Sequence, residues 1–360
     1  MTINRFYIKL KLQDLYRKCI IVTFALFFSN CSFAQLSKST KTILTDENLY
    51  DPDKSKSNSI DIKIDSLMKV SHANGVLIRN QVITKQWEYD KNIDQKTEVQ
   101  SITKTIMSLL LGIAIDKGLI SNINDKVIKY YPQLDAGKYS NEITFKHLVT
   151  VSSGIKAKKN KENYGNHIDM PPGIDARYHN DHFDLLAKAL TYIYDKSLLE
   201  VLKDSVLIPL DIEAEWSIDG EILSSNGNTI PVYAGYAFSK WTAKDLAKIG
   251  YLYLQNGKWE DKQIISQEYV QESLTPISIP LMVSRPNQEV HIDSNNTYGY
   301  GWRAKKRPNG TYIWYMSGNG GQFCVIIPEK NMVFVKINGY SEKYKPYRGV
   351  DQFLDFLLAP

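Results

Sequence analysis

Ser101 and Lys104, three positions apart, form the pair in this chain that is best suited to nucleophilic chemistry. They precede residues 106–115, where nearly every residue is apolar or small, and then come Lys117 and Gly118. Such a stretch predicts a buried helix that ends with a left-handed glycine cap. Residues three apart share a helix face, and the positive end of the helix dipole favours an alkoxide and a neutral amine. The pair can therefore activate a serine hydroxyl without a histidine.

The Ser-x-x-Lys pattern is weak on its own, because it occurs at Ser66/Lys69, Ser101/Lys104 and Ser153/Lys156. The first copy lies in a short amphipathic segment and fits a solvated helix face. The third copy runs into a basic, polar stretch that predicts a loop. Only the second copy opens a buried helix, so Ser101 is the predicted nucleophile.

Residues 1–34 predict a secretory signal peptide that is not part of the fold. A basic segment precedes an apolar run over residues 19–28, and Ser32-Phe33-Ala34 forms a small-x-small cleavage site. The apolar run is too short to span a bilayer as a helix. A lipid anchor at Cys31 is a minor alternative, because the residues before it are a poor lead-in to a lipidated cysteine. We expect an exported protein, periplasmic or secreted, that begins at Gln35.

Removing this segment changes the charge of the chain. Of the 44 Lys+Arg and 39 Asp+Glu residues, five and one lie in residues 1–34, which leaves 39 against 38. This balance, without a basic stripe interleaved with aromatic residues, gives no support for nucleic-acid binding. Cys324 is the one cysteine left in the mature sequence, so we expect no intramolecular disulfide. The domain must hold together by its hydrophobic core.

The predicted elements place strands at both ends of the domain and mainly helices between them. A polar lead-in, residues 35–59, precedes a helix over residues 60–70. Strands are predicted over residues 75–78, 82–89, 298–302, 312–316, 323–327 and 332–337, and a last helix over residues 350–358. Joining the end strands gives an α+β domain over residues 60–360. Its α/β part covers about 60–100 and 290–360, and its all-helical insert covers about 101–289.

Further motifs follow in order: residues 143–154, Tyr178-His179-Asn180 and Ser317-Gly318-Asn319-Gly320-Gly321-Gln322. Together with Ser101-Ile102-Thr103-Lys104 they resemble the β-lactamase-related serine hydrolases. These include class C β-lactamases, D-alanyl-D-alanine peptidases, family VIII esterases and 6-aminohexanoate-dimer hydrolases. The resemblance covers about residues 74–335. It implies the β-lactamase/penicillin-binding-protein fold, an antiparallel sheet flanked by the N- and C-terminal helices.

The resemblance also implies catalytic roles. Ser101 would attack an acyl carbon, while Lys104 and Tyr178 would share the proton. An amine beside a phenol titrates as a coupled pair, so the sequence leaves open which of the two is the base.

Four further residues would orient the substrate or stabilise charge. Asn180 would orient Lys104 or the substrate amide, and Ser317 and Gly318 would contact the substrate. The backbone N–H groups of Ser101 and Asn319 would form the oxyanion hole, where one donor typically contributes about a hundred- to a thousandfold in rate.

His179 and His182, with Asp181 between them, suggest a metal site only weakly. The chain has no His-Glu-x-x-His, no cysteine pair lies near these residues, and no Gly-Lys-Ser/Thr follows the glycines of the last motif. We expect neither a metal nor a cofactor.

Met316 departs from the family pattern, in which many members have Lys or His two residues before the motif glycine. That cation helps the penicillin-recognising members to hold a substrate carboxylate, and a thioether cannot replace it. We therefore expect a small ester or amide substrate, as in the 6-aminohexanoate-dimer hydrolase and esterase branch. Met316→Lys should then favour carboxylate-bearing β-lactams, unless Arg303 or Lys104 already supplies the charge.

Two alternative functions stay open. One is a true class C-type β-lactamase or D-alanyl-D-alanine carboxypeptidase. The other is a catalytically silent penicillin-binding or sensing module.

Overall fold

The computed structural model describes residues 59–155, 170–277, 279, 281–285, 288–291, 296–339 and 349–358. The predicted signal peptide, the Gln35 start, the Cys31 anchor and almost all of the lead-in lie outside these residues. Within them, no helix is both long and apolar enough to cross a membrane.

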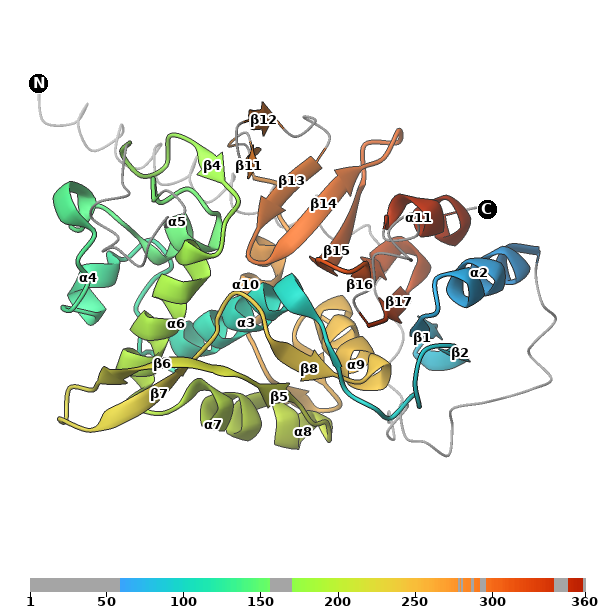
Figure 1. Ribbon diagram of the computed structural model, residues 1–360, viewed down its shortest axis with the longest axis horizontal. Coiled ribbons are helices and arrows are strands. Elements are labelled where there is room, and N and C mark those ends of the chain that lie inside the picture. Colours follow the sequence, from blue (N-terminus) through green and yellow to red (C-terminus); the bar gives the residue numbers. More distant parts are fainter. Residues whose placement is uncertain are drawn as a thin grey trace, which may run out of the picture. The chain divides into compact units, whose positions relative to one another are not determined.

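Both ends of the chain contribute to one seven-stranded sheet (Figure 1). β17 pairs antiparallel with β1, and Asn74 lies opposite Ile337. This pairing confirms the prediction that the end strands join in one antiparallel sheet. The strands, in their order across the sheet, are β13 (Asn296–Gly299), β14 (Trp302–Lys306), β15 (Tyr312–Gly318), β16 (Gln322–Ile327), β17 (Met332–Ile337), β1 (Asn74–Arg79) and β2 (Val82–Glu88).

Helices cover both faces of this sheet. On one face, α2 (Ser59–Val70) contacts α11 (Asp351–Leu357), and Phe353 of α11 packs on Phe334 with ring centroids 5.6 Å apart. On the other face, α9 (Ala243–Leu254) lies on β1, β16 and β17. Every residue of β16 and β17 is buried, because these apolar strands have helices on both sides.

The predicted central helix is α3 (Thr103–Asp116), and residues 103–114 are all buried. Gly118 has a φ of 69°, the left-handed conformation expected of a glycine cap. Ser101, however, lies just before α3, in the 3-10 turn η3 (Gln100–Ile102). Gln100 has a φ of 51°, which is unusual for a residue with a side chain. This local strain directly precedes the predicted nucleophile.

The insert around α3 is largely helical but not purely so, which corrects the expectation of an all-helical insert. β6 (Ile218–Leu223) and β7 (Thr229–Tyr233) form a hairpin around Asn226-Gly227, and Asn-Gly is a strong hairpin signal. The helices of the insert are α4 (Val127–Tyr130), η4 (Gly137–Tyr139), α5 (Phe145–Val149), α6 (Asp181–Tyr194), α7 (Leu198–Leu202), the π-helical η6 (Lys203–Leu207), α8 (Ile208–Leu210), α9 and α10 (Gln267–Ser273).

Short strands of the insert form small sheets apart from the main one. β8 pairs with both β3 and β5, and so connects the segment before Ser101 to the chain before α9. The strands are β3 (Thr97–Glu98), β4 (Ala176–Arg177), β5 (Glu215–Trp216), β6 (Ile218–Leu223), β7 (Thr229–Tyr233), β8 (Ser239–Trp241), β9 (Lys258–Trp259), β10 (Lys262–Gln263), β11 (Leu281–Arg285) and β12 (Gln288–His291).

The single strand predicted over residues 298–302 is wrong. Tyr300 and Gly301 have φ values of 56° and 81° and form the turn between β13 and β14. A Cβ on Gly301 would lie 2.4 Å from the backbone N of Thr105, so glycine lets this turn lie directly on α3. The Thr105 hydroxyl donates to the Gly301 carbonyl at 3.0 Å. The turn therefore fixes the start of β14 beside the start of α3.

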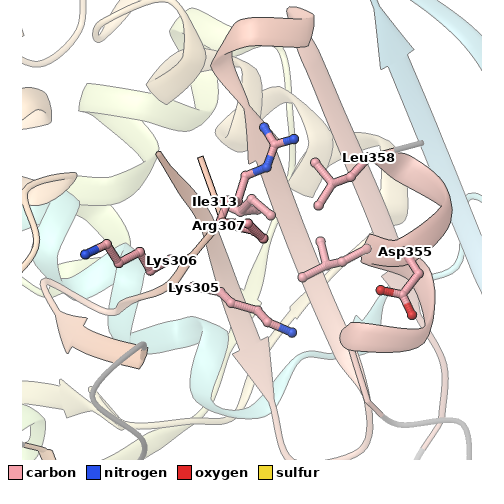
Figure 2. A pocket seen from close by; sticks show the side chains of 8 residues that line it. Lys305, Lys306, Arg307, Ile313, Asp355 and Leu358 are labelled. Atoms are coloured by element: carbon pink, nitrogen blue, oxygen red, sulfur yellow. The ribbon is translucent and has the colours of Figure 1, made fainter. Parts of the chain in front are cut away.

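A groove of about 330 Å³ lies between β14, β15 and α11 (Figure 2). Its basic residues include Lys305 and Arg307, and Ile313 and Leu358 supply apolar walls. Lys305 pairs with Asp351 at 2.6 Å, and Arg307 pairs with Glu329. These ion pairs compensate much of the positive charge of the groove. None of the predicted site residues lines this groove.

Candidate active site

Ser101 is partly exposed at the point where the buried helix begins, so a substrate can reach its hydroxyl. Lys104 is fully buried, and its Nζ lies 3.1 Å from Ser101 Oγ. The spacing of three residues thus brings the hydroxyl and the amine together, as the sequence analysis predicts.

Lys104 Nζ has further partners besides Ser101. It donates to Asn180 Oδ1 at 2.9 Å and to the carbonyl of Tyr236 at 2.7 Å. Burial lowers the pKa of Lys104, the nearby Tyr178 opposes this shift, and the charge of Arg303 adds to it. A neutral amine has two N–H donors for Asn180 and Tyr236, and its lone pair can then accept the Ser101 proton. The arrangement suits a general base.

Tyr178 directly follows β4 and is partly exposed. Its ring centroid lies 5.3 Å from Lys104 Nζ and 4.8 Å from Arg303 Cζ. Burial alone would raise the pKa of Tyr178, but the charges of Lys104 and Arg303 and hydrogen bonds with Ser101 and Arg303 lower it overall. Tyr178 and Lys104 therefore both hold their protons less tightly than usual.

His182 holds the loop that carries Tyr178. Its Nδ1 lies 2.9 Å from Ser153 Oγ, and its Nε2 lies 2.9 Å from the Arg177 carbonyl. The rings of His179 and His182 stack with centroids 4.0 Å apart, and burial lowers the pKa of both. Within the described residues, no group of three His, Cys, Asp or Glu side chains is placed to bind a metal.

Ser153 itself lies differently from the sequence prediction. The third copy was expected to run into a polar loop; Ser153 lies outside helices and strands, but it is fully buried and bonded to His182. Lys156, its partner in the third Ser-x-x-Lys copy, lies outside the described residues. In the first copy, Ser66 is exposed on α2 and donates to the carbonyl of Ile62 at 3.1 Å, as expected of a solvated helix face.

The predicted oxyanion-hole segments lie in contact. A Cβ on Gly318 would lie 2.2 Å from the Val99 carbonyl, so glycine lets the end of β15 approach the chain leading to Ser101. The Gly318 carbonyl accepts from Gly320 and Gly321 at 2.9 and 3.2 Å, and this tight turn exposes Asn319. The Ser101 N–H stands at a helix start, where backbone donors have no partner within the helix.

Met316 and Ser317 point to opposite faces of β15, as successive strand residues do. Met316 is fully buried in the large core cluster and lies opposite Cys324 across the sheet. Ser317 Oγ instead accepts from Arg303 Nε at 3.0 Å. The cation beside this motif thus comes from β14, and the premise that residue 316 would face a substrate needs correction.

Met316→Lys is therefore expected to destabilise the protein rather than to improve β-lactam turnover. An unpaired ammonium in an apolar core is costly, because it loses its hydration. We expect a melting temperature lower by about 5 °C or more, measured by calorimetry, while Met316→Leu should stay near wild type. Equal melting temperatures for the two variants would contradict this expectation.

One site group could not be found from sequence. The carbonyl of Tyr236 binds Lys104 through the backbone, so its residue type carries no signal. Phe238, two residues later, has a φ of 66°, and for an aromatic residue this is a strained conformation.

Comparisons with known proteins identify the family and the fold of this chain. The family model described as β-lactamase matches residues 63–338. β-Lactamase-like protein 2 of Dictyostelium discoideum is 25% identical over 224 residues, which cover 52% of this chain and 40% of that relative. The match therefore spans less than half the length of this curated relative.

Solved structures share the fold. A provisionally named 6-aminohexanoate-dimer hydrolase from Bacillus anthracis superposes with a TM-score of 0.63 at 16% identity, over 82% of each chain. A D-stereospecific amidohydrolase from Streptomyces has a TM-score of 0.57 at 17% identity, over 80% of this chain and 96% of its own. Together with the family match over most of the domain, these findings identify the chain as a member of the β-lactamase-related serine hydrolase family.

Proposed function

We propose that this protein is an exported serine hydrolase that cleaves a small ester or amide through an acyl-enzyme on Ser101. The observation that carries the proposal is the position of Lys104 Nζ, 3.1 Å from Ser101 Oγ and bonded to Asn180 and Tyr236. These two acceptors orient the amine toward the hydroxyl. A nucleophile and base at hydrogen-bond distance, with the base held by a further group, is the arrangement that nucleophilic catalysis requires.

The reaction divides into two steps. The Lys104–Tyr178 pair takes the Ser101 proton while Ser101 Oγ bonds to the acyl carbon. The backbone N–H groups of Ser101 and Asn319 stabilise the oxyanion that forms. Collapse of this tetrahedral intermediate breaks the bond between the acyl carbon and the alcohol or amine, which leaves with the proton that the pair took from Ser101. Water then attacks the acyl-enzyme and gives its proton to the same pair. The pair passes this proton to Ser101 Oγ as the acyl–oxygen bond breaks, which releases the acid and free Ser101.

Family membership supports hydrolase activity in general, and the substrate class rests on residues near Ser101. The 6-aminohexanoate-dimer hydrolase and amidohydrolase structures support an ester or amide bond. The second candidate, a β-lactamase or D-alanyl-D-alanine carboxypeptidase, is favoured by Arg303, because a guanidinium beside Ser317 can bind a substrate carboxylate.

A comparison of three probes tests the proposal. The mature protein is incubated with a fluorophosphonate, a labelled penicillin and p-nitrophenyl acetate, and both label and turnover are followed. We expect fluorophosphonate labelling and ester turnover. Efficient turnover of the penicillin would favour a β-lactamase, and labelling without turnover of any probe would favour a silent binding module. Absence of any labelling would contradict the proposal.

Export gives a separate prediction. Cleavage after Ala34 should place Gln35 at the N-terminus of the native protein, because Ser32-Phe33-Ala34 fits signal peptidase. Sequencing the N-terminus of protein purified from its native host checks this. A start at Cys31 carrying a lipid would show a tethered protein instead, and a start at Met1 would argue against export.

A further inference from the structure

Tyr178 lies close to two cations that come from different parts of the fold. Lys104 reaches it from α3, and Arg303 reaches it from β14, at 5.3 and 4.8 Å from the ring centroid. Arg303 is opposite Tyr298 on β13 and Tyr315 on β15, and its guanidinium lies 5.4 Å from the Tyr298 ring. The Tyr298 ring meets Tyr178 edge to face at 4.9 Å. Tyr178 is therefore enclosed by Lys104, Arg303 and Tyr298.

Two contacts hold Arg303 in this place. Its Nε donates to Ser317 Oγ at 3.0 Å, and the turn at Gly301 fixes the start of β14 on α3. Arg303 also lines a cavity of about 300 Å³ together with Ser317 and Gly318, and its side chain is partly exposed. Among the described residues, no carboxylate forms an ion pair with Arg303.

Other titratable groups around the Lys104–Tyr178 pair contribute less charge. Burial raises the pKa of Tyr298, and burial lowers the pKa of His179 and His182, so all three are neutral near pH 7. Asp181 lies 3.5 Å from His179 Nδ1. The titratable groups that face the pair are thus Tyr298 from β13, Arg303 from β14, His179 from the loop before α6, and His182 from α6, while Asp181 lies beside His179.

We propose that Arg303 supplies, from β14, the permanent positive charge that Met316 cannot supply, and that this charge prepares the Lys104–Tyr178 pair to accept the Ser101 proton. A guanidinium stays charged at any pH in which the protein is folded, whereas Lys104 changes its charge during catalysis. A fixed cation favours the form of the pair that has lost one proton, whether Lys104 or Tyr178 gave it up. Arg303 is thus a positioning residue that acts through the pair, and this inference rests on the proposed function.

The rate constant for fluorophosphonate labelling of Ser101, measured from pH 5 to 10, tests this role. The rate constant is a property of each folded molecule and does not depend on how much protein is folded. In the wild-type protein the labelling rate constant should rise with pH as the pair loses a proton, and this rise is the acid limb of the profile. Arg303→Gln should move the acid limb to a pH about one unit higher, so that labelling at pH values below the limb is about tenfold slower than in the wild-type protein. Above the limb, the rate should stay near wild type. Arg303→Lys, which keeps the charge, should retain the wild-type limb.

Lys305→Gln is the matched control, because Lys305 lies on the same strand but pairs with Asp351 at the groove of Figure 2. It should leave the profile unchanged. An unmoved limb in Arg303→Gln, or an equal loss at every pH, would overturn the proposal. If Arg303→Gln does not fold, Arg303→Lys alone tests the proposal. An acid limb moved by about one pH unit in this charge-preserving variant would overturn the proposal. An unlabelled wild-type protein would instead reject the proposed function.

Discussion

Ser101→Ala is expected to abolish covalent labelling by fluorophosphonate and to lower kcat/KM for p-nitrophenyl esters by roughly 10⁴-fold or more. The side chain that is removed carries the hydroxyl that lies 3.1 Å from the buried amine of Lys104. The fold should stay intact, because Ser101 is partly exposed and the core contacts of α3 begin after it. Labelling and steady-state turnover check both results.

Ser66→Ala is the matched control for this change. Ser66 also belongs to a Ser-x-x-Lys pattern but is exposed on α2, far along the chain from the predicted site residues. The Ser66→Ala variant should be labelled by fluorophosphonate and should turn over p-nitrophenyl esters like the wild-type protein. Covalent labelling that persists in Ser101→Ala would place the nucleophile elsewhere.

Lys104→Met should lower kcat for esters by about 10²- to 10⁴-fold, the usual contribution of a positioned general base. Methionine fills similar space but cannot accept the Ser101 proton. The change also leaves Asn180 Oδ1 and the Tyr236 carbonyl without their donor, so a stability loss of about 1–3 kcal/mol should accompany it. Steady-state kinetics and thermal unfolding measure the two effects separately.

Lys117→Met, at the other end of the central helix segment, provides the comparison. Lys117 is exposed and donates to Ser205 at 2.9 Å. Its loss should change neither kcat nor KM by more than about twofold, because surface contacts of this kind contribute little. Equal losses in Lys104→Met and Lys117→Met would mean that the effect is structural and that Lys104 has no part in proton transfer.

Much of the fold followed from sequence because its signals were local. The apolar stretch after Ser101 could only be a buried helix, and residues 103–114 are buried throughout. The alternation and spacing of the C-terminal strands placed them in one sheet with β1. The start of α9 is also set by a local signal, because the Thr242 side chain accepts from the backbone N–H of Asp245 at 3.0 Å.

The errors came from backbone conformations that residue types do not reveal. Tyr300 adopts a left-handed φ, so a run of aromatic residues and glycines that favours a strand instead forms a turn. Gln100 also has a left-handed φ, and Ser101, the predicted nucleophile, lies in the 3-10 turn that it begins. β5 and β8 could not be predicted, because a strand of two or three residues has no detectable period.

The site was only partly visible in the sequence. Motif residues such as Lys104 and Asn180 were named because their types and order are distinctive. Arg303 was named only as an alternative source of charge, since its approach to Tyr178 depends on the pairing of β14 with β13 and β15. The role of the Tyr236 carbonyl could not be predicted, because every residue has a backbone carbonyl and the residue type carries no information about it.

The most direct test of the account is the site of covalent attachment in the wild-type protein. The protein is labelled with fluorophosphonate, digested with trypsin and analysed by mass spectrometry. We predict a single adduct on the peptide of residues 97–104, with fragmentation assigning it to Ser101 rather than to Thr97 or Thr103. An adduct on any other residue, or an unmodified Ser101 peptide in protein that turns over ester, would contradict the account.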